Sequence, residues 1–190
     1  MPASLIMLLI AITVYWIYTV AIFRLFGIPQ SYSDTFYKLN EIKKHLGVLF
    51  PIMLITTTAM VMPSWLELSD RILPWGTFLA FFGGTGLCFV AVAPFFKECK
   101  RDTGHPIKDL IYQSFHGQGL VHTIGALMSM IAVAVWTAFT PYWVVLVAII
   151  AVVLICGFST KSLKTSSIFW VEFVIFNSIF TTMLIALLFN

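Results

Sequence analysis

The chain has 190 residues, of which 60% are hydrophobic and only 10% are charged. A soluble domain has roughly 25% charged residues, so this composition excludes a soluble protein, a disordered chain and a nucleic-acid-binding module. It indicates an integral membrane protein, whose orientation depends on where its basic residues lie rather than on the formal net charge of +3.

Six apolar segments are long enough to cross a bilayer, because a hydrocarbon core of ~30 Å needs about 20 helical residues. They are predicted at 3–26, 45–66, 73–96, 115–139, 141–159 and 166–189. The fourth and fifth meet at Thr140-Pro141-Tyr142, and so short a junction predicts a tight helical hairpin. The sequence therefore predicts an all-α, polytopic membrane protein, in which residues 1–190 form a single domain built as a six-transmembrane-helix bundle.

The basic residues are distributed unevenly between the two sides of this predicted bundle. Three connections, 27–44, 97–114 and 160–165, share one side, and they or their edges hold ten of the eleven basic residues: Arg24, Lys38, Lys43, Lys44, Lys97, Lys100, Arg101, Lys108, Lys161 and Lys164. The opposite side holds only Arg71. Because cytoplasmic loops are enriched in Lys and Arg, we expect these three connections in the cytoplasm and both termini outside.

The first connection concentrates hydroxyl groups and one carboxylate directly beneath the predicted membrane. It contains Ser31, Ser33, Asp34 and Tyr37. Ser33 or Asp34 is of a type that caps the start of a helix, so one interpretation is a capped short helix alone. The other is a lip that binds a lipid headgroup, with Ser31, Ser33 and Tyr37 as binding residues and Asp34 as a catalytic candidate.

The third apolar segment carries small residues on one helical face. Gly83 and Gly84 are at its centre. Such a face lets a second helix approach closely, and that helix belongs either to the same chain or to a second copy. A homo-oligomer that forms through Gly83 and Gly84 is therefore one prediction.

The fourth apolar segment combines polar and small residues on one face. Gln118, His122, Gly125 and Ser129 follow i, i+4, i+7, i+11 spacing, which aligns them on a helix. We expect this face to point into the bundle. It is either a packing seam with Gln118 and His122 hydrogen-bonded across helices, or part of a functional site.

The last apolar segment contains a carboxylate, Glu172. An ionisable side chain in hydrocarbon costs ~2.5–3.5 kcal/mol on insertion scales and is a functional-site candidate. Glu172 and His122 each lie roughly 10 Å from the same side of the membrane, at 1.5 Å per residue. We expect them to meet, with both as catalytic candidates and Gln118 as a binding residue.

Histidines in the predicted cytoplasmic half suggest a second use of this region. His45, His116 and His122, with Glu98, are candidate ligands for a divalent metal, since zinc accepts such ligands. The spacing is not that of a known metal motif, because His116 and His122 are six residues apart and do not share a helical face. The identity of any cofactor stays open.

Three motifs carry a resemblance to known families: Ile28-Pro29-x-Ser31-x-Ser33-Asp34-Thr35-x-x-Tyr37, the segment from Phe89 to Phe96, and His122-x-x-Gly125-Ala126. They resemble small six-span membrane proteins of gut Bacteroidetes and their phages, which implies a bacterial inner membrane and no particular activity. More remotely, they are similar to the damage-regulated autophagy modulator group and its GPI-anchor-remodelling relatives, which implies work on or with lipids. Alkaline ceramidases and progestin-receptor-like hydrolases are less similar, because they have seven spans and a His-x-x-x-His pair.

Three functions follow as alternatives. The leading one is a lipid-associated protein whose cytoplasm-facing polar pocket binds or hydrolyses the headgroup of a membrane lipid, with His122 or Glu172 as general base or metal ligand. The second is a small ion or proton channel or transporter in which the same two residues titrate. The third is a non-catalytic membrane scaffold or regulator. Whether the protein is an enzyme stays open, and no nucleic-acid partner is expected.

Overall fold

In a computed structural model of the chain, residues 2–73, 75–96, 112 and 114–189 are described. These residues form helices and connections, with no strand among them. The α-helices are α1 (Ala3–Phe26), α2 (Asp34–Ile42), α3 (Leu49–Ile72), α4 (Gly76–Val92), α6 (Gly117–Phe139), α7 (Trp143–Ser159) and α8 (Ser167–Phe189), and the 3-10 turns are η1 (Leu46–Val48) and η2 (Ala93–Phe95). The predicted all-α class is confirmed.

Five helices among the described residues are long and apolar enough to cross a membrane. They are α1, α3 extended by η1, α4 extended by η2, α6 and α8. Together they support an integral membrane protein. The fifth predicted segment, 141–159, corresponds to α7, which is also apolar but has only 17 residues. Its role as a sixth crossing stays a prediction.

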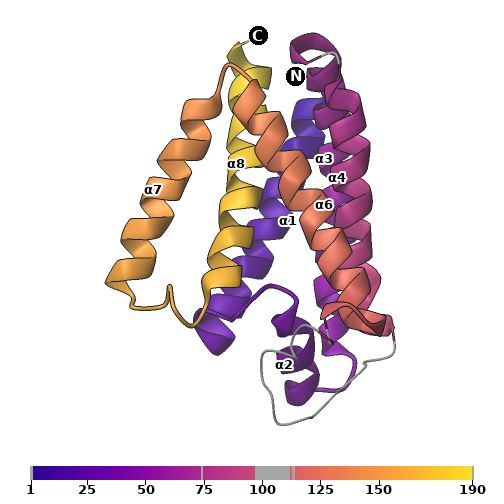
Figure 1. The fold of residues 1–190 in the computed structure, drawn as a ribbon, viewed down its shortest axis with the longest axis vertical. Helices are drawn as coiled ribbons and strands as arrows, with labels where there is room; N and C mark the ends of the chain where they lie inside the picture. The colour runs from indigo at the N-terminus through magenta and orange to yellow at the C-terminus, as the bar shows by residue number, and fades with distance from the viewer. Residues whose placement is uncertain (1, 74, 97–111, 113, 190) are drawn as a thin grey trace.

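The long helices stand side by side, and both ends of the chain lie at the same end of the bundle (Figure 1). We call this the terminal end. Helix α2 lies across the opposite end, which we call the α2 end (Figure 1). Helix α6 runs obliquely, so its lower part lies away from the lower part of α8 (Figure 1). The two helices therefore diverge toward the α2 end of the bundle (Figure 1).

Helix α3 is longer than the sequence predicts, because it continues from residue 66 to Ile72. The added turns contain Glu67 and Arg71, whose side chains form an ion pair of 2.7 Å at i, i+4 spacing. Such a pair supports a helix in water, so the charged residues extend the helix beyond the apolar segment. Pro63 lies inside α3, where neighbouring helices tolerate it in a membrane protein.

A seam of small residues joins α4 to α6. A Cβ atom added to Gly86 would lie 2.6 Å from the carbonyl oxygen of Gly125, and one added to Gly125 would lie 2.6 Å from the carbonyl oxygen of Gly86. The backbones therefore meet directly, as small residues permit. We call Gly86, Gly125 and Ser129 the glycine seam. The predicted inward face of α6 is confirmed at Gly125 and Ser129, which are both buried.

Gly83 and Gly84 are also buried within the single chain. A Cβ atom on Gly83 would meet the ring of Trp65, and one on Gly84 would meet the sulfur of Met62. Side chains of α3 therefore fill this face. A homo-oligomer stays a prediction. The face of Gly83 and Gly84, through which it is predicted to form, is already covered by side chains of the same chain.

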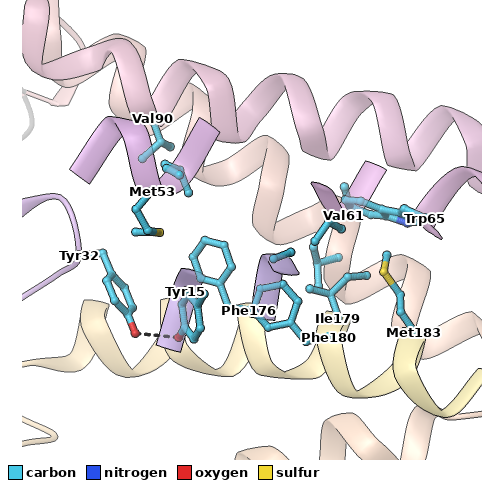
Figure 2. Packing of buried hydrophobic residues seen from close by; sticks show 14 of the residues in the cluster. Tyr15, Tyr32, Met53, Val61, Trp65, Val90, Phe176, Ile179, Phe180 and Met183 are labelled. Carbon is cyan, nitrogen blue, oxygen red and sulfur yellow. Dashed lines mark hydrogen bonds between the residues drawn. The ribbon is translucent and has the colours of Figure 1, made fainter. Parts of the chain in front are cut away.

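The core between α1 and α8 is aromatic. Figure 2 shows Tyr15, Tyr32, Phe176 and Phe180 in one group, with Trp65 farther along the bundle. The ring centroid of Tyr15 lies 5.1 Å from that of Phe176 and 5.6 Å from that of Tyr32. Tyr32 comes from the connection before α2 and not from a spanning helix. The first connection thus inserts a side chain into the bundle core.

Candidate functional site

The connection between α1 and α2 is fastened to the first turns of α8. The backbone N–H of Phe169 donates to the carbonyl oxygen of Gln30 at 2.9 Å. The backbone N–H of Tyr32 donates to Oε2 of Glu172 at 2.7 Å. A carboxylate that accepts a backbone N–H makes a strong, charge-assisted hydrogen bond. Glu172 therefore holds the connection in place, and the connection fixes one oxygen of Glu172.

The side chain of Tyr32 strengthens this attachment from inside the bundle. Its hydroxyl lies 2.7 Å from the hydroxyl of Tyr15 and 3.0 Å from that of Thr19 (Figure 2 shows the first of these bonds). Burial raises the pKa of the Tyr32 phenol, so it stays neutral and can donate. Asn177 on α8 donates to the Tyr15 hydroxyl at 3.3 Å. A short polar network thus crosses the aromatic core.

A cavity of about 190 Å³ lies between α6 and α8 next to this network. Its walls come from His122, Ala126 and Met130 on α6, and from Ser167, Ile168, Val171 and Glu172 on α8. Ile168 is 59% exposed and Val171 is 43% exposed, so the cavity wall continues onto the outer surface of the bundle. Apart from His122, Ser167 and Glu172, the lining residues are apolar.

His122 and Glu172 therefore share one cavity, as their matched depth predicts. They are not hydrogen-bonded to each other: Glu172 accepts from Tyr32, and the buried Nε2 atom of His122 has no hydrogen-bond partner among the described residues. A buried polar atom without a partner costs about 1–3 kcal/mol. The cavity walls thus contain an unsatisfied imidazole nitrogen, buried beneath the surface of α6, and a carboxylate on α8.

Two smaller, separate cavities lie inside the bundle, and each shares lining residues with the cavity before it. Glu172, Ala126 and Met130 also line a cavity of about 30 Å³ that Tyr32, Met53 and Val90 help to enclose. Beyond it, a cavity of about 20 Å³ reaches Trp65. The aromatic rings and aliphatic side chains around them are visible in Figure 2. A discontinuous, apolar line of packing defects therefore leads from the α6–α8 cavity toward the terminal end.

Helix α2 also contacts the first turn of α6. The side-chain amide of Gln118, at the start of α6, donates to the hydroxyl of Tyr37. The segment that begins at Gln30 is thus attached to α8 through Tyr32 and to α6 through Tyr37. Two of the predicted binding residues, Gln118 and Tyr37, come together at this point, at the entrance of the bundle rather than in the cavity.

Ser31, Ser33 and Asp34 have mainly local roles. The backbone N–H of Asp34 donates to Oγ of Ser31 at 3.1 Å, and Ser33 makes no side-chain cap. The predicted cap at Ser33 or Asp34 is therefore wrong, because Ser31 has the spacing that reaches the free N–H. Asp34 forms a 2.9 Å ion pair with Lys38 and does not line the α6–α8 cavity.

The metal-ligand candidates lie apart. His45 is exposed and has a left-handed backbone, with φ of 76°. The exposed His116 ring stacks on that of Tyr112 at 3.8 Å, and only His122 lines the cavity. Glu98 lies outside the described residues. Within the part of the chain that the structure describes, no three His, Cys, Asp or Glu side chains are grouped in a way that would hold a metal ion.

Two residues of the site are missing from the sequence prediction. Tyr32 lies between Ser31 and Ser33. It contacts Glu172 through its backbone N–H, which does not depend on the type of residue and therefore cannot be predicted from the sequence. Ser167 precedes Glu172 by five residues, and its only sequence signal is a hydroxyl at the start of the last apolar segment. Both are recognisable only when the connection and the two helices are placed together.

Comparison with protein families, with curated proteins and with solved structures finds no match to this chain. The resemblance to six-span proteins of gut Bacteroidetes, and the remoter one to lipid-remodelling families, therefore stay predictions.

Proposed function

We propose that this integral membrane protein binds a membrane lipid in the cavity between α6 and α8, with the polar head of the lipid at His122 and Glu172. The observation that carries the proposal is that these two ionisable side chains line one cavity of about 190 Å³ whose other walls are almost entirely apolar. An ionisable residue inside a spanning helix is expensive and is retained for function.

The size and position of the cavity favour a lipid over a soluble ligand. Clefts for drug-sized ligands are ~300–1,000 Å³, so this cavity accommodates only a segment of a larger molecule. His122 and Glu172 each lie five residues inside their helices, about 8 Å along the axis. A lipid whose head reaches this depth keeps the remainder of its chains in the bilayer beside the exposed Ile168 and Val171.

The proposal includes a membrane topology. We take α7 as a sixth crossing, because 17 helical residues span about 26 Å and a bilayer adapts to a slightly short helix. With the basic residues of the α2 end in the cytoplasm, both termini then face outward. A bacterial inner membrane fits this orientation.

The site leaves room for chemistry on the bound lipid. Hydrolysis is the reaction class to test, with His122 or Glu172 as general base. The channel or transporter alternative has no comparable support, because the cavities beyond Glu172 are small and lined mostly by apolar residues. The scaffold alternative predicts that the cavity binds no ligand, and the same experiment tests it.

The test is lipid capture by the full chain in nanodiscs. A phospholipid with a photoreactive group in its acyl chain is cross-linked, and the modified residues are located by mass spectrometry. We expect cross-links at Met130 and Val171. Ala126→Leu fills the wall shared by two cavities and should reduce capture about fivefold, since an added isobutyl group competes for the same space.

Ala59→Leu is the matched control. Ala59 is exposed on α3 and lines none of the cavities described above, so the same substitution should leave capture unchanged. Equal labelling of the wild type, Ala126→Leu and Ala59→Leu would show that lipids touch only the outer surface, and the proposal would be abandoned.

A further inference from the structure

The α6–α8 cavity also indicates what kind of lipid head it takes. Among the described residues that line it, Glu172 is the only carboxylate, and the partner that the structure shows for Glu172 is a neutral backbone N–H from Tyr32. The ion pairs of the described residues, Asp34 with Lys38 and Glu67 with Arg71, lie elsewhere. Within the described part of the chain, no Lys or Arg side chain neutralises this carboxylate.

A carboxylate in this position is most stable when a cation accompanies it, because burying an unpaired charge costs several kcal/mol. The remaining polar groups of the cavity point to the form of that cation. The Ser167 hydroxyl can accept a hydrogen bond, whereas Nε2 of His122 is buried beneath the cavity surface. Together with Glu172, the described lining offers two acceptors.

We infer that the cavity selects lipids whose head carries a primary ammonium group. An ammonium has three N–H donors and no acceptor, which suits a lining that offers a carboxylate and a hydroxyl. A trimethylammonium head has the same charge but no N–H to donate. A head that consists of phosphate alone is anionic and is repelled by Glu172. The expected ligand class is therefore aminophospholipids such as phosphatidylethanolamine, or long-chain amines.

This inference depends on the proposed lipid site and is tested separately from it. The full chain in nanodiscs is offered equal amounts of photoreactive phosphatidylethanolamine and phosphatidylcholine with identical acyl chains. We expect about tenfold preferential capture of phosphatidylethanolamine in the cavity, the difference that one charge-assisted hydrogen bond provides. Glu172→Gln should bring the preference to within about twofold while total capture persists.

The Gln variant suits this purpose because its amide oxygen still accepts the N–H of Tyr32, so the connection stays attached. Glu67→Gln is the matched control: it removes a carboxylate from the end of α3, away from the cavity, and should keep the full preference. Added aqueous ethanolamine distinguishes the source of the ammonium. If it displaces neither lipid, the acyl chain is required; if it displaces both, the site takes the free amine and the lipid class is wrong.

The outcomes separate the two proposals. Capture of both lipids in the cavity with no preference, or a preference that survives Glu172→Gln, overturns the ammonium inference and leaves the lipid site intact. Cavity labelling by neither lipid, with Ala126→Leu equal to the wild type, overturns the lipid site itself.

Discussion

The two faces of helix α6 are built in opposite ways. Toward α4, Gly125 and Ser129 form the glycine seam, where two backbones meet with no room for a methyl group. Toward α8, His122 and Ala126 border an open cavity of about 190 Å³. Within two turns, helix α6 thus combines direct backbone contact with α4 and a cavity toward α8.

The two faces also differ in whether their polar groups have hydrogen-bond partners. On the glycine seam, the hydroxyl of Ser129 donates to the carbonyl oxygen of Gly125 at 2.8 Å, so its polar group is satisfied inside the protein. On the cavity face, Nε2 of His122 has no partner among the described residues. Membrane helices associate through close packing and internal hydrogen bonds. The seam therefore serves the fold, and the cavity face is available to a ligand.

The largest effect on stability is expected from a substitution that overfills the glycine seam. Gly125→Leu places a side chain where even a Cβ atom would lie 2.6 Å from the carbonyl oxygen of Gly86. Overpacking of this kind costs ~1–3 kcal/mol or more, and a backbone neighbour cannot move aside easily. We expect a large drop in the unfolding midpoint in detergent, or failure to fold.

The stability of Gly125→Leu is compared with that of Ala126→Leu, which places the same side chain at the next residue of α6. It faces the cavity and should lower the unfolding midpoint little, while it reduces lipid capture. If Gly125→Leu and Ala126→Leu had equal stability, the contrast between the two faces would be wrong.

An intermediate effect is expected from the attachment of the first connection. Tyr32→Phe keeps the ring in the aromatic core and removes the hydroxyl that bonds to Tyr15 and Thr19. Loss of buried hydrogen bonds of this kind costs about 1–2 kcal/mol, measurable by denaturant titration. The variant retains the backbone N–H to Glu172, so lipid selectivity should stay unchanged. A change in selectivity would mean that the tyrosine network shapes the cavity directly.

Much of this architecture is readable from the sequence, because long apolar segments and their punctuation are local features. The predicted segments 3–26 and 166–189 agree with α1 and α8 to within one residue. Segment 45–66 ends too early, since hydropathy does not register that an ion pair between Glu67 and Arg71 extends a helix into water. The matched depth of His122 and Glu172 likewise predicts that they lie close together, and both line one cavity.

Other features of the site have no local signature. The bond from Tyr32 to Glu172 uses a backbone N–H, which every residue except proline possesses, and it joins positions 140 residues apart. Asp34 shows the opposite error, because its residue type and position suggest a site residue. In the structure, its carboxylate instead forms an ion pair with Lys38 within α2. Residue type therefore predicts which groups can react, and only the packing of helices decides which of them face a cavity.

The smallest effect is expected where the α2 segment contacts α6. Tyr37→Phe removes the hydrogen bond from Gln118, but Tyr37 is 42% exposed and water replaces the lost partner. An exposed hydrogen bond contributes about 0.5 kcal/mol, so the unfolding midpoint should shift far less than in Tyr32→Phe. The two substitutions remove the same atom from the same short segment, so they compare its attachment to α8 with its attachment to α6. A larger loss in Tyr37→Phe would mean that α2 is held mainly by α6, and the segment would then be stabilised from the opposite wall of the cavity.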